Sequence, residues 1–532
     1  MIRTEQKIFI AVAILYVLSI CTAKGETLWP LPKQMMLSGS PYPISKALCF
    51  NTLSKSSILQ RGITRYLSYI TTHLLPSEES SLYEEELEIV VLNVANDDET
   101  LGMNTSYKYE IYFRSSNTLY INAQSPFGAL YGLETFSQLI ENGDLIHQFV
   151  SISDESSYIH RGLLVDTGRR IFPLELLYNT LDAMSFVKMN VLHFHLTDFG
   201  RFSVESKLYP NLRNNESEIY TQDDIKNLIA YARDRGIRVV PEVEAAGHAN
   251  GMLGLSNKTH GLVFCNFSGY IQLYNDPQQV TLRTMKGIIS EMMSLFPDEL
   301  FHLGLDEIFD DKNCTMENLK ALETALLHHV AKNKTTVAWE EALSRTKNAL
   351  SNTVIQAWKG ESIKTIVGKR HRAINSLARN FYLDIETVTP TKLWTDISSG
   401  LNQKERKYLL GGEMAMWTDE YCDIFECYDQ MKKKPKAWWM YNSAYSAQFT
   451  QSISGLIWPR AVIGAGSFWN YVKDLKTDSA NFNLRYKSMN QRLMERGILT
   501  CPLGCKCDYL TRCGKPYQQQ LNTKTGPPLF MK

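Results

Sequence analysis

Eight short apolar segments, separated by amphipathic stretches, constrain the fold of this chain more than any other feature. Strands that alternate with helices pair in parallel, because each helix carries the chain back to the start of the next strand. Eight repeats over roughly 310 residues predict a (β/α)8 barrel of the TIM type. The alternative is an open doubly wound sheet, but no Gly-rich phosphate loop follows the first segment, which argues against its nucleotide-binding form. The segments are Gly162–Asp166, Val191–Thr197, Arg238–Val243, Leu300–Gly304, Thr336–Trp339, Val354–Trp358, Arg372–Leu377 and Leu409–Trp417.

Apolar residues at helical spacing predict the helices between these segments. Four of them are expected at Pro173–Lys188, Thr221–Arg235, Pro277–Leu295 and Met316–Asn333. The second opens with Thr-x-x-Asp, a loose form of the capping box that begins many helices.

The chain before the barrel is predicted to form a small α/β domain. Its expected elements are strands at Leu87–Val94, Tyr107–Arg114 and Thr118–Ala123, followed by a helix at Phe127–Ile140. The predicted organisation is therefore a signal peptide at 1–23, an N-terminal α/β domain at 24–157, a catalytic barrel at 158–500 and a Cys-rich tail at 501–532.

The N-terminus has the three parts of a secretory signal peptide. Arg3 and Lys7 precede a 13-residue apolar run, Ile8–Ile20, and small residues end at Ala23, after which we expect cleavage. An uncleaved signal anchor is the alternative. No later stretch approaches 18 uninterrupted apolar residues, so the mature protein is expected to be soluble, without a membrane span.

Sequons and cysteines agree with entry into the secretory pathway. Glycan attachment is expected on accessible asparagines. Nine of the ten cysteines follow residue 23, so at least one lacks an intramolecular partner. Cys501, Cys505, Cys507 and Cys513 form a compact cluster, for which an oxidising compartment favours disulfides over zinc. The six sequons are at Asn104, Asn215, Asn257, Asn266, Asn313 and Asn333.

The charge balance excludes a typical nucleic-acid partner. Lys and Arg number 56, equal to the 56 Asp and Glu, whereas a nucleic-acid binder usually carries a basic excess.

Polar and aromatic residues gather where the predicted strands end, which in such barrels is the active-site face. Asp306 and Glu307 are the sharpest element, because two adjacent carboxylates repel and one of them can keep a proton for general-acid catalysis. The alternative is a solvated acidic pair at a helix start. His193 and His195 suggest a second hypothesis, a metallohydrolase, since residues two apart on a strand face the same side.

Several motifs resemble the lysosomal and secreted β-N-acetylhexosaminidases of glycoside hydrolase family 20. The resemblance covers essentially residues 27–500, and its motifs occur in the family's order. The matching stretches are Trp29-Pro-Leu-Pro32, Gly132-Leu-Glu-Thr-Phe136, His160-Arg-Gly-Leu-Leu-Val-Asp-Thr-Gly-Arg169, Asn190-Val-Leu-His-Phe-His-Leu-Thr-Asp198, His302-Leu-Gly-Leu-Asp-Glu307, Ala338-Trp-Glu-Glu341 and Gly411-Gly-Glu-Met-Ala-Met-Trp417.

The resemblance implies exo-cleavage of terminal β-GlcNAc or β-GalNAc with retention of configuration, by substrate-assisted catalysis. The 2-acetamido oxygen of the sugar attacks its own anomeric carbon and forms an oxazolinium ion. Glu307 would be the acid and base, Asp306 would stabilise the acetamido group, and Tyr382 would donate to its oxygen. Substrate binding is implied for Arg169, Asp198, His248, Trp339, Trp358, Asp384, Trp417 and Asp419.

The same resemblance implies a disulfide between Cys265 and Cys314, a glycan or glycoconjugate substrate, no cofactor or metal, and a possible homodimer. The destination would be the lysosome, an equivalent acidic granule, or the medium.

Four positions depart from the family pattern. Leu305 replaces a usual Gly, Phe199 a polar residue, Glu244 a usual Asp and Asp419 a usual Glu. Three hypotheses therefore remain: an active hexosaminidase, a catalytically weakened glycan-binding relative, and an unrelated metallohydrolase.

Overall fold

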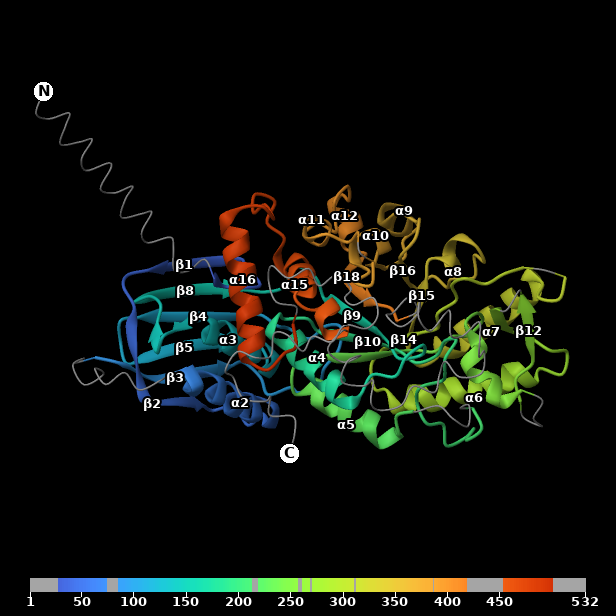
Figure 1. The fold of residues 1–532 in the computed structure, drawn as a ribbon, viewed down its shortest axis with the longest axis horizontal. Helices are drawn as coiled ribbons and strands as arrows, with labels where there is room; N and C mark the ends of the chain where they lie inside the picture. Colours follow the sequence, from blue (N-terminus) through green and yellow to red (C-terminus); the bar gives the residue numbers. More distant parts are fainter. Residues whose placement is uncertain are drawn as a thin grey trace, which may run out of the picture.

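The computed structural model describes residues 27–73, 85–212, 219–256, 261–267, 270–310, 312–385, 387–418 and 453–500. Figure 1 shows an N-terminal sheet at one end of the molecule and a barrel beside it. Two large hydrophobic cores correspond to these two parts.

The N-terminal part is built on an eight-stranded mixed sheet in the order β1-β8-β4-β5-β3-β2-β7-β6. Helices α2 (Ser57–His73) and α3 (Pro126–Gln138) pack together, and α3 is buried almost throughout. The strands are β1 (Gln34–Ser38), β2 (Tyr42–Thr52), β3 (Leu87–Val94), β4 (Tyr109–Arg114), β5 (Thr118–Ala123), β6 (Ile140–Glu141), β7 (Asp144–Leu145) and β8 (Phe149–Asp154).

The sequence undercounted this sheet. It predicted β3, β4, β5 and the helix α3 but missed helix α2 and the remaining strands. The outer strand β1 is exposed at alternate residues, and β2 carries Lys46 and polar residues along its length, so neither forms a continuous apolar run.

The predicted (β/α)8 barrel is confirmed. Eight parallel strands close in the order β10-β11-β14-β15-β16-β17-β18-β9. Every residue of seven strands is buried, and β15 is exposed only in part at Thr335. The strands are β9 (His160–Asp166), β10 (Val191–His195), β11 (Arg238–Glu242), β14 (Leu300–His302), β15 (Thr335–Trp339), β16 (Val354–Ala357), β17 (Ala373–Asn375) and β18 (Leu409–Met416).

The helices of the barrel follow their sequence signals. Thr221 caps α5 with a complete capping box to Asp224, as its Thr-x-x-Asp pattern predicts. A short hairpin of β12 (Phe264–Phe267) and β13 (Tyr270–Leu273) interrupts the alternation after β11. The main helices are α4 (Leu174–Phe186), α5 (Gln222–Arg233), α6 (Val280–Leu295), α7 (Met316–Val330), α15 (Arg460–Asn470) and α16 (Ala480–Glu495). The shorter ones are η2 (Ala249–Leu255), α8 (Glu341–Ser344), α9 (Ile363–Gly368), α10 (Ala378–Phe381), α11 (Pro390–Leu393) and α12 (Gln403–Arg406).

The two parts are held together by side chains from each part that pack in the hydrophobic core of the other. Trp29 precedes the sheet but packs in the core of the barrel, and Trp469 of α15 packs in the core of the sheet. The ammonium group of Lys188 lies 4.7 Å from the centre of the Trp469 ring and donates a 2.7 Å hydrogen bond to the Tyr109 hydroxyl. Lys188, Met189 and Gly236 all form hydrogen bonds with the N-terminal part, and they lie just before β10 and β11. The N-terminal part therefore contacts the barrel at the N-terminal ends of these strands, opposite the strand ends that carry the site.

Among the described helices, none combines the length and apolarity that a membrane crossing requires. The signal peptide at 1–23 and the Cys-rich tail at 501–532 lie outside the described residues.

Candidate active site

The acidic pair follows β14 in a tight, left-handed stretch of backbone. Gly304, Leu305 and Glu307 have φ angles of 65°, 75° and 42°. A Cβ at Gly304 would lie 2.1 Å from Glu244 Oε2, and the positive φ would strain any side chain there, so the position favours glycine. Left-handed backbone at non-glycine residues is costly and accumulates at functional sites.

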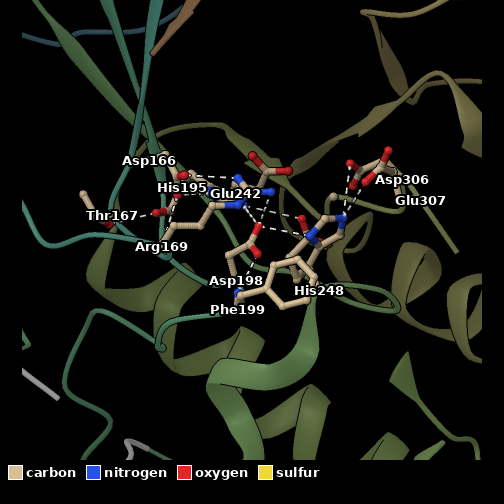
Figure 2. Close-up of polar contacts among 12 residues, drawn as sticks. Asp166, Thr167, Arg169, His195, Asp198, Phe199, Glu242, His248, Asp306 and Glu307 are labelled. Carbon is tan, nitrogen blue, oxygen red and sulfur yellow. Dashed lines mark hydrogen bonds and ion pairs between the residues drawn. The ribbon is translucent and has the colours of Figure 1, made fainter. Parts of the chain in front are cut away.

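His248 connects the acidic pair to the opposite side of the site (Figure 2). Its Nδ1 lies 3.1 Å from Asp198 Oδ2, and its Nε2 lies 3.5 Å from Glu307 Oε2 and 3.8 Å from Asp306 Oδ2. The His248 side chain is 3% exposed, whereas that of Glu307 is 36% exposed. Asp198, His248 and Glu307 thus form a chain of contacts from the barrel interior to the solvent.

The electrostatics separate the two acids. Burial raises the pKa of Asp306 to about 6, against the opposing effect of His248. The interaction with His248 lowers the pKa of Glu307 more than partial burial raises it. Burial lowers the pKa of His248, but the charges of Asp198 and Asp306 outweigh that effect and raise it well above its usual value. The carboxyl whose pKa is raised is therefore Asp306. The sequence analysis expected one acid of the pair to favour its protonated form and did not decide which.

Arg169 holds two of the carboxylates on the other side of the site. Its terminal nitrogens lie 3.1 Å from Asp166 Oδ2 and 3.0 Å from Asp198 Oδ2, and its guanidinium lies 5.1 Å from the centre of the Trp417 ring. A planar fork shared between two carboxylates is fixed in orientation.

Four aromatic side chains form one wall. Trp339 lies 6.0 Å from Trp417 and 6.5 Å from Trp358, measured between ring centres. Tyr382 lies 5.9 Å from Trp417 and parallel to Trp358 at 6.3 Å. The structure thus brings together the aromatic residues that the sequence selected. Asp384 lies two residues beyond Tyr382 and is partly buried.

Two carboxylates that the sequence analysis did not select hold this wall in place. Trp339 Nε1 donates a 2.7 Å hydrogen bond to Glu242 Oε1, and Trp358 Nε1 donates a 3.1 Å bond to Glu341 Oε2. Burial raises the pKa of Glu341 to about 7, and the charge of Asp306 adds to the effect. The side chain of Glu340 also accepts backbone N–H bonds from residues 358–361, which fixes the loop that carries Trp358. The sequence signal that could have identified Glu340 and Glu341 was the Trp-Glu-Glu motif at the end of β15.

The histidines that suggested a metallohydrolase are paired with carboxylates. Two groups in the described residues have metal-like spacing, His193 with Glu242 and His302, and His195 with Glu242 and Glu244. However, His193 Nδ1 lies 2.7 Å from a Glu413 oxygen and its Nε2 lies 2.9 Å from a Glu242 oxygen.

Burial lowers the pKa of His193, but the charges of Glu413 and Glu242 outweigh it and raise that pKa to about 9. Burial likewise lowers the pKa of His195, and the charge of Glu242 together with hydrogen bonds to Asp166 and Glu244 raises it well above its usual value. An imidazolium has both nitrogens protonated and no lone pair for a metal. These histidines hold the barrel interior together through ion pairs.

The departures from the family pattern lie next to the acids. Leu305 is fully buried in the barrel core, and Glu244 Oε1 lies 3.5 Å from His195 Nε2. The ring of Phe199 lies 5.6 Å from that of His248. Asp419 lies outside the described residues.

The remaining predicted residues are two cysteines and the asparagines of the sequons. The structure contains the disulfide between Cys265 and Cys314 that the resemblance implied. Asn104, Asn266, Asn313 and Asn333 are exposed, whereas Asn215 and Asn257 lie outside the described residues.

The barrel, its paired carboxylates and its aromatic wall define a glycoside hydrolase. Residues 158–471 match the model of "Glycosyl hydrolase family 20, catalytic domain", and residues 28–139 match "beta-acetyl hexosaminidase like". The chain belongs to glycosyl hydrolase family 20.

Curated relatives and solved structures agree with this family. The chain is 26% identical to the mouse beta-hexosaminidase subunit beta, covering 90% of this chain and 92% of the relative. It is 29% identical to beta-hexosaminidase 1 of Arabidopsis thaliana, covering 83% and 84%. Among solved structures, the chitobiase of Flavobacterium johnsoniae gives a TM-score of 0.71 at 23% identity, covering 89% of this chain and 73% of that one.

Proposed function

We propose that this protein is an exo-acting β-N-acetylhexosaminidase that removes terminal, non-reducing β-GlcNAc and β-GalNAc from glycans. The observation that carries the proposal is Asp306, whose side chain is 14% exposed, beside Glu307, whose side chain is 36% exposed, with the aromatic wall next to them. Such a site has one carboxylate enclosed with the sugar and one facing the leaving group. The relatives named above as hexosaminidases support the same activity.

Asp306 would act on the acetamido group. One of its oxygens, Oδ1, is buried and has no hydrogen-bond partner among the described residues, so it can accept the acetamido N–H. A hydrogen bond from the amide, and then the positive charge of the oxazolinium ion, favour the ionised carboxylate. Tyr382, at the edge of the aromatic wall, would donate to the acetamido oxygen as it attacks the anomeric carbon. The configuration is retained because the sugar itself supplies the nucleophile.

Glu307 would protonate the leaving oxygen and afterwards accept a proton from water. Its pKa is low before substrate binds, so the proton must arrive with the substrate complex. His248, held by Asp198 on one nitrogen, contacts Glu307 with the other and would orient the Glu307 carboxyl toward the leaving oxygen. A leaving group covering Glu307 would also remove solvent and raise its pKa.

The other selected residues would bind or orient the substrate. Arg169 would hold ring hydroxyls, and Asp198 would hold the His248 ring. The sugar and its acetamido methyl would be enclosed by Trp339, Trp358 and Trp417. Asp384 and Asp419 would bind the outer hydroxyls. No cofactor or metal enters these steps.

We further propose cleavage of the signal peptide after Ala23, glycosylation at the exposed sequons, and delivery to an acidic compartment or the medium. A homodimer is a further proposal, supported by the family alone. We also propose the domain limits 24–157 and 158–500; the division of most buried residues between two hydrophobic cores supports them.

The decisive test is hydrolysis of three aryl β-glycosides, those of GlcNAc, GalNAc and glucose. We expect turnover of the first two and none of the glucoside, which lacks the acetamido nucleophile. Incubation with a chelator is expected to leave turnover intact. Glu307→Gln, a nearly isosteric control, is expected to lower kcat for an alkyl glycoside by roughly 10²–10⁴-fold. Binding without turnover by the unaltered protein would instead indicate a glycan-binding relative.

A further inference from the structure

A second aromatic group adjoins His248 and includes a residue of the loop that carries the acidic pair. We call it the rim cluster, and it consists of Phe199, Phe267, Tyr270 and Phe309. Phe309 lies 5.0 Å from Phe267 in a parallel stack and 4.9 Å from Tyr270, and Tyr270 lies 5.5 Å from Phe199. These four rings form a continuous surface from β10 to the loop that follows β14.

The rim cluster contacts the catalytic machinery directly. Phe199 packs with its edge against His248, beside Asp198 (Figure 2). Phe309 is two residues beyond Glu307 on the same loop. His248 in turn lies 3.5 Å from Glu307 and 3.8 Å from Asp306, and Glu307 is the more exposed of the two acids, at 36% against 14%.

The cluster is held rigidly in spite of its exposure. Gln272 of β13 is buried, accepts a 2.6 Å hydrogen bond from the backbone N–H of Phe309 and donates a 2.9 Å bond to its carbonyl oxygen. The disulfide Cys265–Cys314 joins the β12–β13 hairpin to the chain beyond that loop. Tyr270 is nevertheless 38% exposed, and the other three rings are partly exposed. An exposed apolar surface fixed beside a reactive group is typical of a ligand contact.

We propose that the rim cluster is the binding platform for the leaving-group side of the substrate, and that its ligand is the pyranose ring attached through the scissile oxygen. This inference rests on the proposed function. Glu307 must contact that oxygen to protonate it, so the sugar beyond the oxygen extends from Glu307 toward solvent. The rings of Tyr270 and Phe309 form an exposed apolar surface beside the loop that carries Glu307, and they can cover the C–H face of a pyranose while its hydroxyls remain hydrated.

The proposal also gives a role to Phe199, which stands where the family usually has a polar residue. A phenyl ring there extends the surface from Tyr270 to His248, which a polar side chain would not do. Binding energy from this remote sugar can support positioning of the scissile bond, so its effect should appear in kcat/KM for extended substrates.

The test compares two substrates with the same terminal sugar: the β1,4-linked GlcNAc disaccharide and methyl β-GlcNAc. For Tyr270→Ala, we expect the ratio of kcat/KM for the disaccharide to that for the methyl glycoside to fall by roughly 3–10-fold, the value of one aromatic contact. Tyr270→Phe keeps the ring and should retain the wild-type ratio. Tyr112→Ala removes an aromatic residue of similar exposure on β4, far from the site, and is the matched control.

An equal change on both substrates, or a wild-type ratio in Tyr270→Ala, would overturn the platform. Phe309→Ala provides a second measurement, with its urea midpoint reported alongside so that unfolding is recognised. Failure of the unaltered protein to cleave either substrate would refute the proposed function itself, which is a different result from an unaltered ratio.

Discussion

Leu305 tests whether the left-handed backbone before the acids stores conformational energy. Its φ is 75° and its side chain is fully buried. Leu303, two residues earlier, is equally buried and does not have a positive φ, so it is a control in the same loop. Replacing either leucine with Ala removes buried methyl groups and leaves space, which costs roughly 2–5 kcal/mol.

The glycine variants separate strain from burial. At Leu303, Gly should be less stable than Ala by roughly 1 kcal/mol, because glycine has more freedom in the unfolded chain. At Leu305, a second effect opposes this loss of stability. A residue with a Cβ in the left-handed conformation costs roughly 1–2 kcal/mol, and glycine avoids that cost. The Gly-minus-Ala difference should therefore be about 1–2 kcal/mol more favourable to Gly at Leu305 than at Leu303.

The assay is urea unfolding of the four variants followed by tryptophan fluorescence, with midpoints compared at a common slope. Each variant is measured against the wild type, so the shared loss of packing cancels in the double difference. Equal Gly-minus-Ala differences at the two positions would mean that residue 305 carries no backbone strain, and the reasoning would fail.

Three further predictions follow from the site and its supports. Asp306→Asn should lower kcat for the aryl GlcNAc glycoside by roughly 10²-fold, because a neutral amide cannot stabilise the oxazolinium charge, and an unaltered kcat would contradict its role. His193 has a folded pKa of about 9, so its ion pairs stabilise the barrel fully below the unfolded pKa of about 6.5, and this stabilisation is lost as pH rises through 9. Glu413 has a folded pKa that His193 lowers in spite of burial, so its ion pairs stabilise the barrel above the unfolded pKa of about 4.5, and this stabilisation is lost as pH falls. Thermal midpoints across this range should therefore peak between about pH 4.5 and 6.5, and a continuous rise toward pH 9 would refute the ion-pair account. Replacing Cys265 and Cys314 together by Ser should lower the free energy of unfolding by roughly 3–4 kcal/mol, because the bond closes a separation of 49 residues, and an unchanged urea midpoint would count against it.

The sequence by itself determined the barrel and most of its site. Parallel strands buried on both faces must be short apolar runs, so all eight were visible in the sequence, with ends within a few residues of those observed. Their C-terminal ends share one face of the barrel, which is why Asp306, Glu307 and the aromatic residues could be grouped before any coordinates were known.

Tertiary structure decided what depends on neighbours distant in the chain. The exposed strand β1 joins its sheet through pairing with β8, more than one hundred residues later, and its own residues carry no clear pattern. Likewise, the proton preference of Asp306 over Glu307 depends on burial and on the position of His248 from another strand end. Electrostatic energies depend on distance and solvation, and the sequence specifies neither until the chain has folded.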